Sequence, residues 1–423
     1  MQARPALTDV AERSTPGLVA LARPALFFLL VVVGFVACAG DGGQGGVLPD
    51  TLPTGRVIVS NPDPGGALPL SLVEELRIGS IVSTGPDVFG NVGSLAIDQA
   101  GSVYVGDYAA GEVRSFGADG TFLRVVTRRG PGPGQIPASV FPFNLLWQEP
   151  HRLWIGATPT LFFVDSLGNG GDVAHRLPGN AAWTPHADTL GGIYGRRLDL
   201  VERESSRLVH ESWVERLAVS EDGTVSAAGR LLLGRVEYRV GQTVSRGGAR
   251  GNVMQTRPMH VETPWTVDPG GEIWRVGAPD YALHRVTLGG DTVRTVKLPR
   301  VPVPLTGRER ADLAESSPFS AAELPAHKPL IRDIKAGPDG WLWVRLWSSN
   351  PNDDAWDIFD PCGRHLGVAT PDLPLDAVPW LPYRGGRLLA VTRDAFDVEI
   401  VVRLRAETDS GAPVLTSGCA SFE

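Results

Sequence analysis

The chain has 423 residues, of which 43% are hydrophobic and 20% charged, so it can bury a large core and is too apolar for a disordered protein. Its 51 glycines and 35 prolines would interrupt helices and argue against a mostly helical fold. The 39 basic and 47 acidic residues give a net charge of −8, which disfavours a nucleic-acid binder. We therefore expect a globular, non-helical protein with no nucleic-acid partner.

The amino-terminal part predicts an exported protein. Residues 25–38 read ALFFLLVVVGFVAC, an apolar run that follows several arginines. The run is shorter than the roughly 20 residues of a membrane-spanning helix, and glycine-rich polar sequence follows it at once. These features are typical of the apolar region of a secretory signal, and they predict a signal peptide over residues 1–37.

A cysteine ends this apolar run. The motif Phe35-Val36-Ala37-Cys38 resembles the lipobox of bacterial lipoproteins, although a leucine is usual at the position of Phe35. The resemblance implies that Cys38 is lipidated and anchors the protein to the membrane of the bacterial cell envelope, on its periplasmic or surface side. An ordinary cleaved signal and an uncleaved anchor are the alternatives. Residues 38–70 are rich in Gly, Pro and Asp without periodicity, and they predict a flexible tether.

Two cysteines remain once Cys38 is assigned to the lipid anchor. An exported protein lies in a compartment where disulfides form, so Cys362 and Cys419 are candidates for a bridge. Two free thiols are the alternative.

A short pattern recurs along the chain: a turn residue, a variable residue, an aliphatic residue and then an aromatic residue. Alternating apolar residues between turns are typical of half-buried strands. Further short strands precede and follow most copies, giving four antiparallel strands in about 45 residues, which predicts β-propeller blades. The clear copies are Gly101–Val105, His151–Ile155, Gly191–Tyr194, Gly271–Val276 and Gly340–Val344.

These repeats resemble the NHL-like, six-bladed β-propeller proteins of bacteria. The resemblance implies an all-β, six-bladed propeller over residues 71–410, followed by a tail over 411–423. Residues 217–225 align with 95–103 and give seven blades as the alternative. The residues that carry the resemblance are Leu95-Ala96-Ile97-Asp98, Gly101–Val105, Asp107, Val113–Phe116, Asp119-Gly120 and Gly130–Gly134.

The last blade lacks an outer strand of its own. Residues 74–79 match the outer strand of the first blade at 122–126, so we expect this amino-terminal strand to close the last blade. That closure would leave no open sheet edge at the seam of the ring. Between the fourth and fifth blades, Thr306 and Glu309 have the spacing of a capping box and predict a short helix in an insertion that ends at Pro325.

The candidate channel residues are three histidines. His186, His260 and His327 each lie within or just before the innermost strand of a different predicted blade. Some NHL-like propellers are metal-dependent lyases or lactonases, so the resemblance gives an alternative in which a divalent metal occupies the central channel. The three histidines lie at different distances from their repeat anchors, which argues against a shared metal site.

The sequence favours binding over catalysis. We see no coherent catalytic set, expect no cofactor, and predict a membrane-anchored propeller that binds a protein, peptide or glycan. Asp98, Asp188 and Asp268 each stand six residues before a repeat anchor, and a residue that recurs in this way is expected to stabilise turns.

Overall fold

The computed structural model describes the chain from residue 49 to residue 414 with internal gaps, and every structural statement below refers to that part. Strands dominate the described residues, as the sequence predicts. They are accompanied by one α-helix, α1(Gly307–Glu315), and one 3-10 helix, η2(Ala321–Glu323). The described ranges are 49–53, 55–64, 69–80, 85–132, 134–137, 140, 142–157, 160–165, 175–177, 181–220, 224–244, 250–259, 263–277, 280–348, 354–412 and 414.

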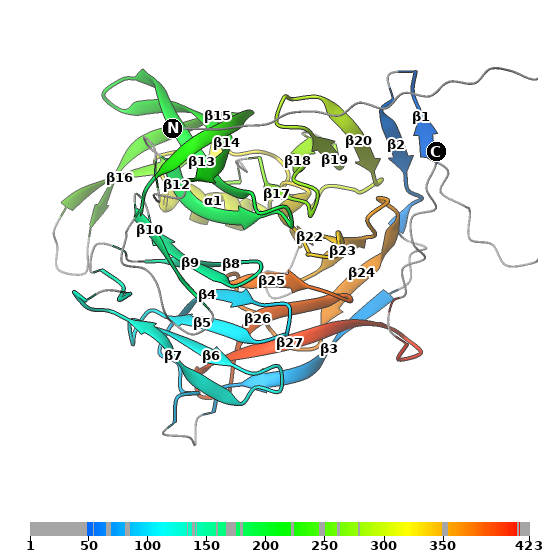
Figure 1. Ribbon diagram of the computed structural model, residues 1–423. Helices are drawn as coiled ribbons and strands as arrows, with labels where there is room; N and C mark the ends of the chain where they lie inside the picture. The colour runs from blue at the N-terminus through cyan, green and yellow to red at the C-terminus, as the bar shows by residue number, and fades with distance from the viewer. Residues whose placement is uncertain are drawn as a thin grey trace, which may run out of the picture. The chain divides into compact units, whose positions relative to one another are not determined.

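The strands form five sheets (Figure 1). The first contains β4(Val92–Ile97), β5(Val103–Asp107), β6(Glu112–Phe116) and β7(Phe122–Arg128). The second contains β8(Asn144–Gln148), β9(Arg152–Ala157), β10(Thr160–Asp165) and β11(His175–Arg176). The third contains β12(Ala181–Ala187), β13(Ile193–Arg203), β14(Arg207–Val219), β15(Val225–Val244) and β16(Arg250–Thr256).

The last two sheets include strands from the amino-terminal part of the chain. The fourth contains β17(Trp265–Val267), β18(Ile273–Gly277), β19(Ala282–Val286), β20(Thr292–Lys297), β2(Val57–Ser60) and β1(Pro49–Thr51). The fifth, in spatial order, contains β21(Ile331–Ala336), β22(Leu342–Leu346), β23(Trp356–Phe359), β24(His365–Pro371), β3(Pro69–Ile78), β27(Glu399–Thr408), β26(Arg387–Arg393) and β25(Trp380–Tyr383).

The sheets follow one another around a closed ring. Strands β4, β8, β12, β17, β21 and β25 each lie at an end of their sheet, and each contacts the next in this order. Strand β25 in turn contacts β4. Antiparallel sheets of consecutive strands that meet in a ring through their first strands make an all-β, propeller-like fold.

The recurring acidic residues stabilise the turns between first and second strands, as predicted. The Asp188 carboxylate accepts hydrogen bonds from the Gly192 amide at 2.6 Å and from the Tyr194 hydroxyl at 2.8 Å. Asp98 and Asp268 accept from the amides four residues downstream at 2.8 and 3.1 Å. These side chains stabilise tight turns. In each turn a glycine with positive φ follows the aspartate three residues later, for example Gly191 at 87°.

The prediction of a flexible tether over 38–70 is wrong for its described part. Strand β2 pairs in parallel with β20, and β1 pairs with β2. Val59 is 2% exposed and packs in the same hydrophobic cluster as Val296. Residues Val57–Ser60 are three aliphatic residues and a serine, a run too short to indicate a strand among the Gly and Pro residues around it.

Strand β3 joins the two halves of the eight-stranded sheet (Figure 1). It pairs antiparallel with β27, so that Ile78 lies opposite Val401. This is the pairing that the sequence predicts for residues 74–79. Strand β3 also pairs in parallel with β24 through its first residues, where Pro69 lies opposite Val368. A single strand therefore covers what would otherwise be two sheet edges.

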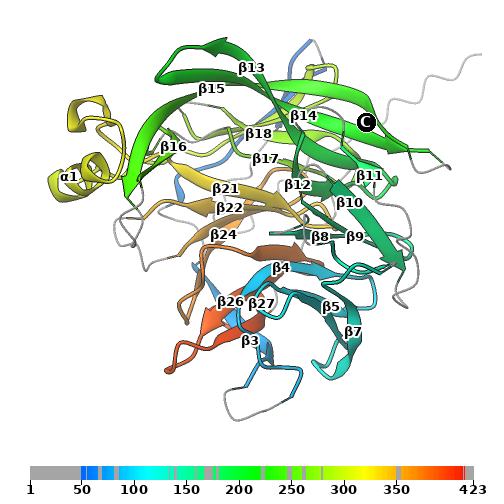
Figure 2. The ribbon, with the colours of Figure 1, turned by 90° about the vertical axis from the view of Figure 1, so that its left-hand side faces the viewer.

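The third sheet contains the longest strands. Strands β14 and β15 have 13 and 20 residues, and β16 pairs with the far end of β15. Residues 217–219 at the end of β14 pair with residues 225–227 at the start of β15. We call β14, β15 and β16 the arm; Figure 2 shows α1 beside the ends of β15 and β16.

Aromatic anchors of the repeats lie in the cores of the sheets. Trp154 and Trp343 are fully buried, Tyr194 is 1% exposed and Trp274 is 4% exposed. Aromatic side chains at the same position of successive repeats therefore have the same structural role: each fills space beside the neighbouring sheet.

Candidate functional site

The sequence-predicted histidines are not assembled into a metal site in the described part of the chain. His186 lies in β12, and its ring packs 4.4 Å from that of Trp265, centroid to centroid. His327 lies between the insertion and β21, is exposed, and forms an isolated bridge with Pro304. His260 lies outside the described residues. Within them, no three His, Cys, Asp or Glu side chains are close enough to share a metal ion.

The cysteine predictions fall largely outside the described residues. Cys362 is disulfide-bonded and lies in the turn between β23 and β24. The other two cysteines of the chain, Cys38 and Cys419, are not among the described residues, so the pairing of Cys362 with Cys419 stays a prediction, as does lipidation of Cys38. In the described part, no helix is long and apolar enough to cross a membrane.

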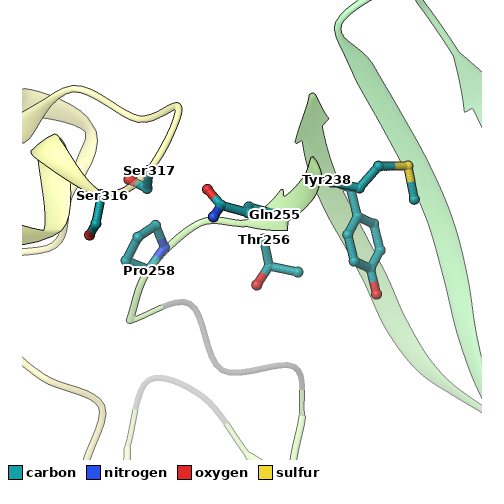
Figure 3. Close-up of a pocket in the computed structure, with 7 residues that line it drawn as sticks. Tyr238, Gln255, Thr256, Pro258, Ser316 and Ser317 are labelled. Atoms are coloured by element: carbon teal, nitrogen blue, oxygen red, sulfur yellow. The ribbon is translucent and has the colours of Figure 1, made fainter. Parts of the chain in front are cut away.

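A cavity of about 480 Å³ lies between the arm and the loop that follows α1 (Figure 3). Tyr238 and Thr256 are opposite each other in the β15–β16 pair, and Met254, two residues before Thr256, lies on the same face of β16. Burial raises the pKa of the Tyr238 hydroxyl, which keeps it neutral. Among the residues that the structure describes, those that line this cavity are uncharged: Tyr238, Met254, Gln255, Thr256, Pro258, Ser316 and Ser317.

The opposite face of the same strands carries a different, charged cavity of about 280 Å³. Glu237 precedes Tyr238 and therefore points to the other side of β15. Around Glu237, arginines and glutamates alternate: Arg207 Nε lies 3.3 Å and Arg239 Nε lies 3.1 Å from its carboxylate. The lining residues are Glu202, Arg207, Val209, Arg235, Glu237, Arg257 and Phe319.

Phe319 docks the insertion onto this charged face. Its ring is 1% exposed and lies 4.5 Å from the guanidinium carbon of Arg239 and 5.8 Å from that of Arg257. Arg239 also forms an ion pair with Glu323 at 2.7 Å. A phenyl ring with two guanidinium groups near its centroid gains cation–π attraction as well as burial, so the insertion is held against the arm.

Two capping boxes give the insertion its local structure. Thr306 caps α1, and the predicted reciprocal pair with Glu309 is present: the Glu309 amide donates to Thr306 Oγ1 at 3.2 Å, and the Thr306 amide donates to Glu309 Oε2 at 2.9 Å. Lys328 Nζ lies 2.5 Å from Glu309. That bond and the capping bonds lower the pKa of Glu309 to about 2. Ser320 and Glu323 repeat the motif at η2, where the bonds from Ser320 and Arg239 lower the pKa of Glu323 to about 2.

The sequence did not predict the contact between the insertion and the arm, or the two cavities beside it. The insertion and its helix were predicted, but their contact with the arm joins residues about 80 positions apart, such as Arg239 and Glu323. The one available signal was the excess length of the third repeat, which has room for strands beyond a four-stranded unit.

Comparisons with known proteins give no family. No protein-family model and no curated protein matches the chain. Among solved structures, it is similar to virginiamycin B lyase of Staphylococcus aureus, with 12% identity, a TM-score of 0.39, and 74% of this chain and 94% of that chain covered. It is also similar to a Bacteroides fragilis protein thought to be exported (11% identity, TM-score 0.43, 83% and 100% covered). A third is the calcium-binding protein regucalcin of Agrobacterium tumefaciens (13% identity, TM-score 0.33, 83% and 100% covered). All three TM-scores are below 0.5, and no conclusion about this chain rests on them.

Proposed function

We propose that this protein is an exported, lipid-anchored, six-bladed β-propeller that binds an extended, uncharged peptide segment of a partner protein between its arm and its insertion. Six blades follow if the eight-stranded sheet is counted as two blades joined by β3. The cell envelope and the anchor at Cys38 follow from the lipobox-like motif and the signal sequence.

The observation that carries the proposal is the cavity of about 480 Å³ beside an edge strand. In the described part of the chain, β16 is the last strand of its sheet and pairs only with β15. The other side of an edge strand offers backbone amide and carbonyl groups to an added strand. A peptide that pairs there would lie next to the cavity, which is large enough for a side chain.

The lining of the cavity supports an uncharged ligand. Hydroxyl, amide and thioether groups surround it, and the charged residues of the arm face the opposite cavity. A buried carboxylate or ammonium of a ligand would find no opposite charge here and would lose its hydration. Backbone pairing would supply affinity, and one apolar or small polar side chain in the cavity would supply specificity.

Selection from a phage-displayed library of random 12-residue peptides tests the proposal. Selected peptides should bind the full chain, and N-methylation of alternate backbone amides should abolish binding because it removes the strand hydrogen bonds. Met254→Glu, which places a carboxylate in the cavity, should weaken binding at least tenfold.

Val301→Glu is the matched control, because Val301 is an exposed apolar residue outside the arm and is 89% exposed. This variant should bind as the unmodified chain does. Failure to select any peptide, or equal affinities of the Met254→Glu and unmodified proteins, would contradict the proposal.

A further inference from the structure

The charged cavity of about 280 Å³ on the second face of the arm is lined by an unequal set of charges. Three guanidinium groups and two carboxylates line it, together with the apolar side chains of Val209 and Phe319. Arg207 binds both carboxylates, because its Nη1 lies 2.9 Å from Glu202 and its Nε lies 3.3 Å from Glu237. Among the described lining residues, one positive charge is therefore in excess.

Two further arginines of the arm have carboxylate partners outside this lining. Arg235 Nη2 lies 3.2 Å from Glu211, and Arg239 Nη1 lies 2.7 Å from Glu323. Each of these glutamates is thus engaged by an arginine of its own. Neither belongs to the cavity wall, so neither supplies the negative charge that the wall lacks.

Arg257 is the remaining arginine of the lining. It follows β16, and its Nε is buried without a hydrogen-bond partner in the part of the chain that the structure describes. No ion pair of the described residues includes Arg257. Its guanidinium carbon lies 5.8 Å from the ring centroid of the buried Phe319, so packing holds it beside the cavity. A guanidinium keeps its charge and carries five N–H donors, so one without a counter-charge beside a cavity attracts an anion.

We propose that this cavity binds a small carboxylate on a short aliphatic chain, and that Arg257 binds the anionic group. A carboxylate is planar and accepts two parallel hydrogen bonds from one guanidinium. Its single negative charge also balances the single excess charge of the lining. A dianion such as phosphate fits less well, because its second charge would be repelled by Glu202 and Glu237.

The size and the apolar part of the cavity limit the rest of the ligand. Its volume of about 280 Å³ lies below the roughly 300–1,000 Å³ typical of pockets for drug-sized molecules, so the ligand has only a few carbon atoms. Val209 and the methylene groups of the arginines offer apolar surface to these carbons. Two sources share this chemistry: a free short-chain carboxylic acid, and the glutamate side chain of a partner peptide.

Ligand-observed NMR of the full chain at pH 7 tests the proposal, with butyrate as the probe. Butyrate should give a saturable signal, whereas butyramide, which has a similar shape and no charge, should give none. Inorganic phosphate should displace butyrate only at a higher concentration than butyrate itself requires. Absence of saturable butyrate binding, equal binding of butyramide, or tighter binding of phosphate would overturn the proposal.

Competition distinguishes the two sources of the carboxylate. The competitor is a blocked pentapeptide with one central glutamate between alanines. If it displaces butyrate at a lower concentration than butyrate itself requires, the natural ligand is a peptide side chain. If it needs a higher concentration, the ligand is a free acid.

Two substitutions with opposite expected effects test the role of Arg257. Arg257→Gln should weaken butyrate binding about tenfold or more, because the charged fork is lost. Glu202→Gln removes a lining carboxylate and should strengthen binding about threefold or more. A folding defect cannot produce this gain. Arg308→Gln, at a side chain that is 93% exposed on α1, makes the same charge change and should bind as the unmodified chain does.

Unchanged affinity of Arg257→Gln, or unchanged or weaker affinity of Glu202→Gln, would overturn the assignment of Arg257. Met254→Glu changes only the uncharged cavity and should leave butyrate binding as it is. Carboxylate binding is therefore measured separately from peptide binding at β16, and either can fail without the other.

Discussion

The side-chain amide of Asn61 donates a hydrogen bond to the carbonyl oxygen of Gly363 at 3.0 Å, across 302 positions of sequence. The same amide donates to the carbonyl oxygen of Lys297 at 3.2 Å, and its oxygen accepts from the amide of His365 at 2.8 Å. One buried side chain thus connects the amino-terminal strands, the fourth sheet and the fifth sheet.

We expect Asn61→Ala to lower the free energy of unfolding by about 2 kcal/mol, because it leaves buried backbone groups at Gly363 and His365 without partners. The measurement is urea unfolding of the two proteins side by side. Asn91→Ala, at an exposed asparagine, is the control and should change stability by less than about 0.5 kcal/mol. Equal losses in both variants would mean that the Asn61 contacts do not stabilise the fold.

The amino-terminal strands should be required for folding. A chain that begins at residue 84 lacks β3 and exposes the backbone edges of both β24 and β27. We expect it to be insoluble or to melt far below a chain that begins at residue 49. A chain that begins at residue 62 keeps β3 and loses only β1, β2 and Asn61, so it should melt between the two. Equal melting temperatures of all three would contradict the role of these strands.

Acid should release the insertion from the arm. The pKa values of Glu309 and Glu323 are lowered to about 2, so their contacts stabilise the fold above the ordinary glutamate pKa near 4.5. This contribution is lost as the pH falls from about 4.5 to about 2. Hydrogen exchange of the peptide that covers residues 304–327 should therefore become faster in this window, relative to peptides from β5.

A variant identifies the groups responsible. Glu309→Gln should speed exchange in the insertion already at pH 7 and weaken its dependence on acid, because a neutral amide cannot form the ion pair with Lys328. Glu315→Gln, at an exposed position at the end of α1, should behave as the unmodified protein does. Equal protection of the insertion at pH 7 and pH 2.5 would refute the expectation.

The disulfide of Cys362 is expected to join Cys419. Because the bond would close a long stretch of chain, the entropic argument predicts a stabilising effect of a few kcal/mol, although measured gains are often smaller. Non-reducing peptide mapping of protein from an oxidising compartment should find the Cys362–Cys419 peptide pair. Two alkylated thiols at these positions would disprove it.

Lipidation of Cys38 remains a prediction from the sequence. Metabolic labelling with a fatty-acid analogue should mark the unmodified chain, and Cys38→Ala should remove the label because the acceptor thiol is lost. The matched control is Cys362→Ala, which keeps the motif. Equal labelling of the unmodified chain and Cys38→Ala would end the claim.

The sequence by itself determined the elements whose causes are local. Alternation of apolar residues, with Asp98, Asp188 and Asp268 followed by glycine, marks strands and turns because side-chain direction and turn chemistry act over two to six residues. The reciprocal spacing of Thr306 and Glu309 marks α1 for the same reason.

Only the tertiary structure decided where these elements meet. The amino-terminal strands pair with β20 and β24, Phe319 packs against Arg239 and Arg257, and Lys335 packs against Trp380. None of these contacts produces a periodic pattern in the sequence, because each depends on how whole sheets pack around the ring. Burial lowers the pKa of the Lys335 amine and raises that of the Asp333 carboxyl, and burial is a property of the assembled fold rather than of neighbouring residues.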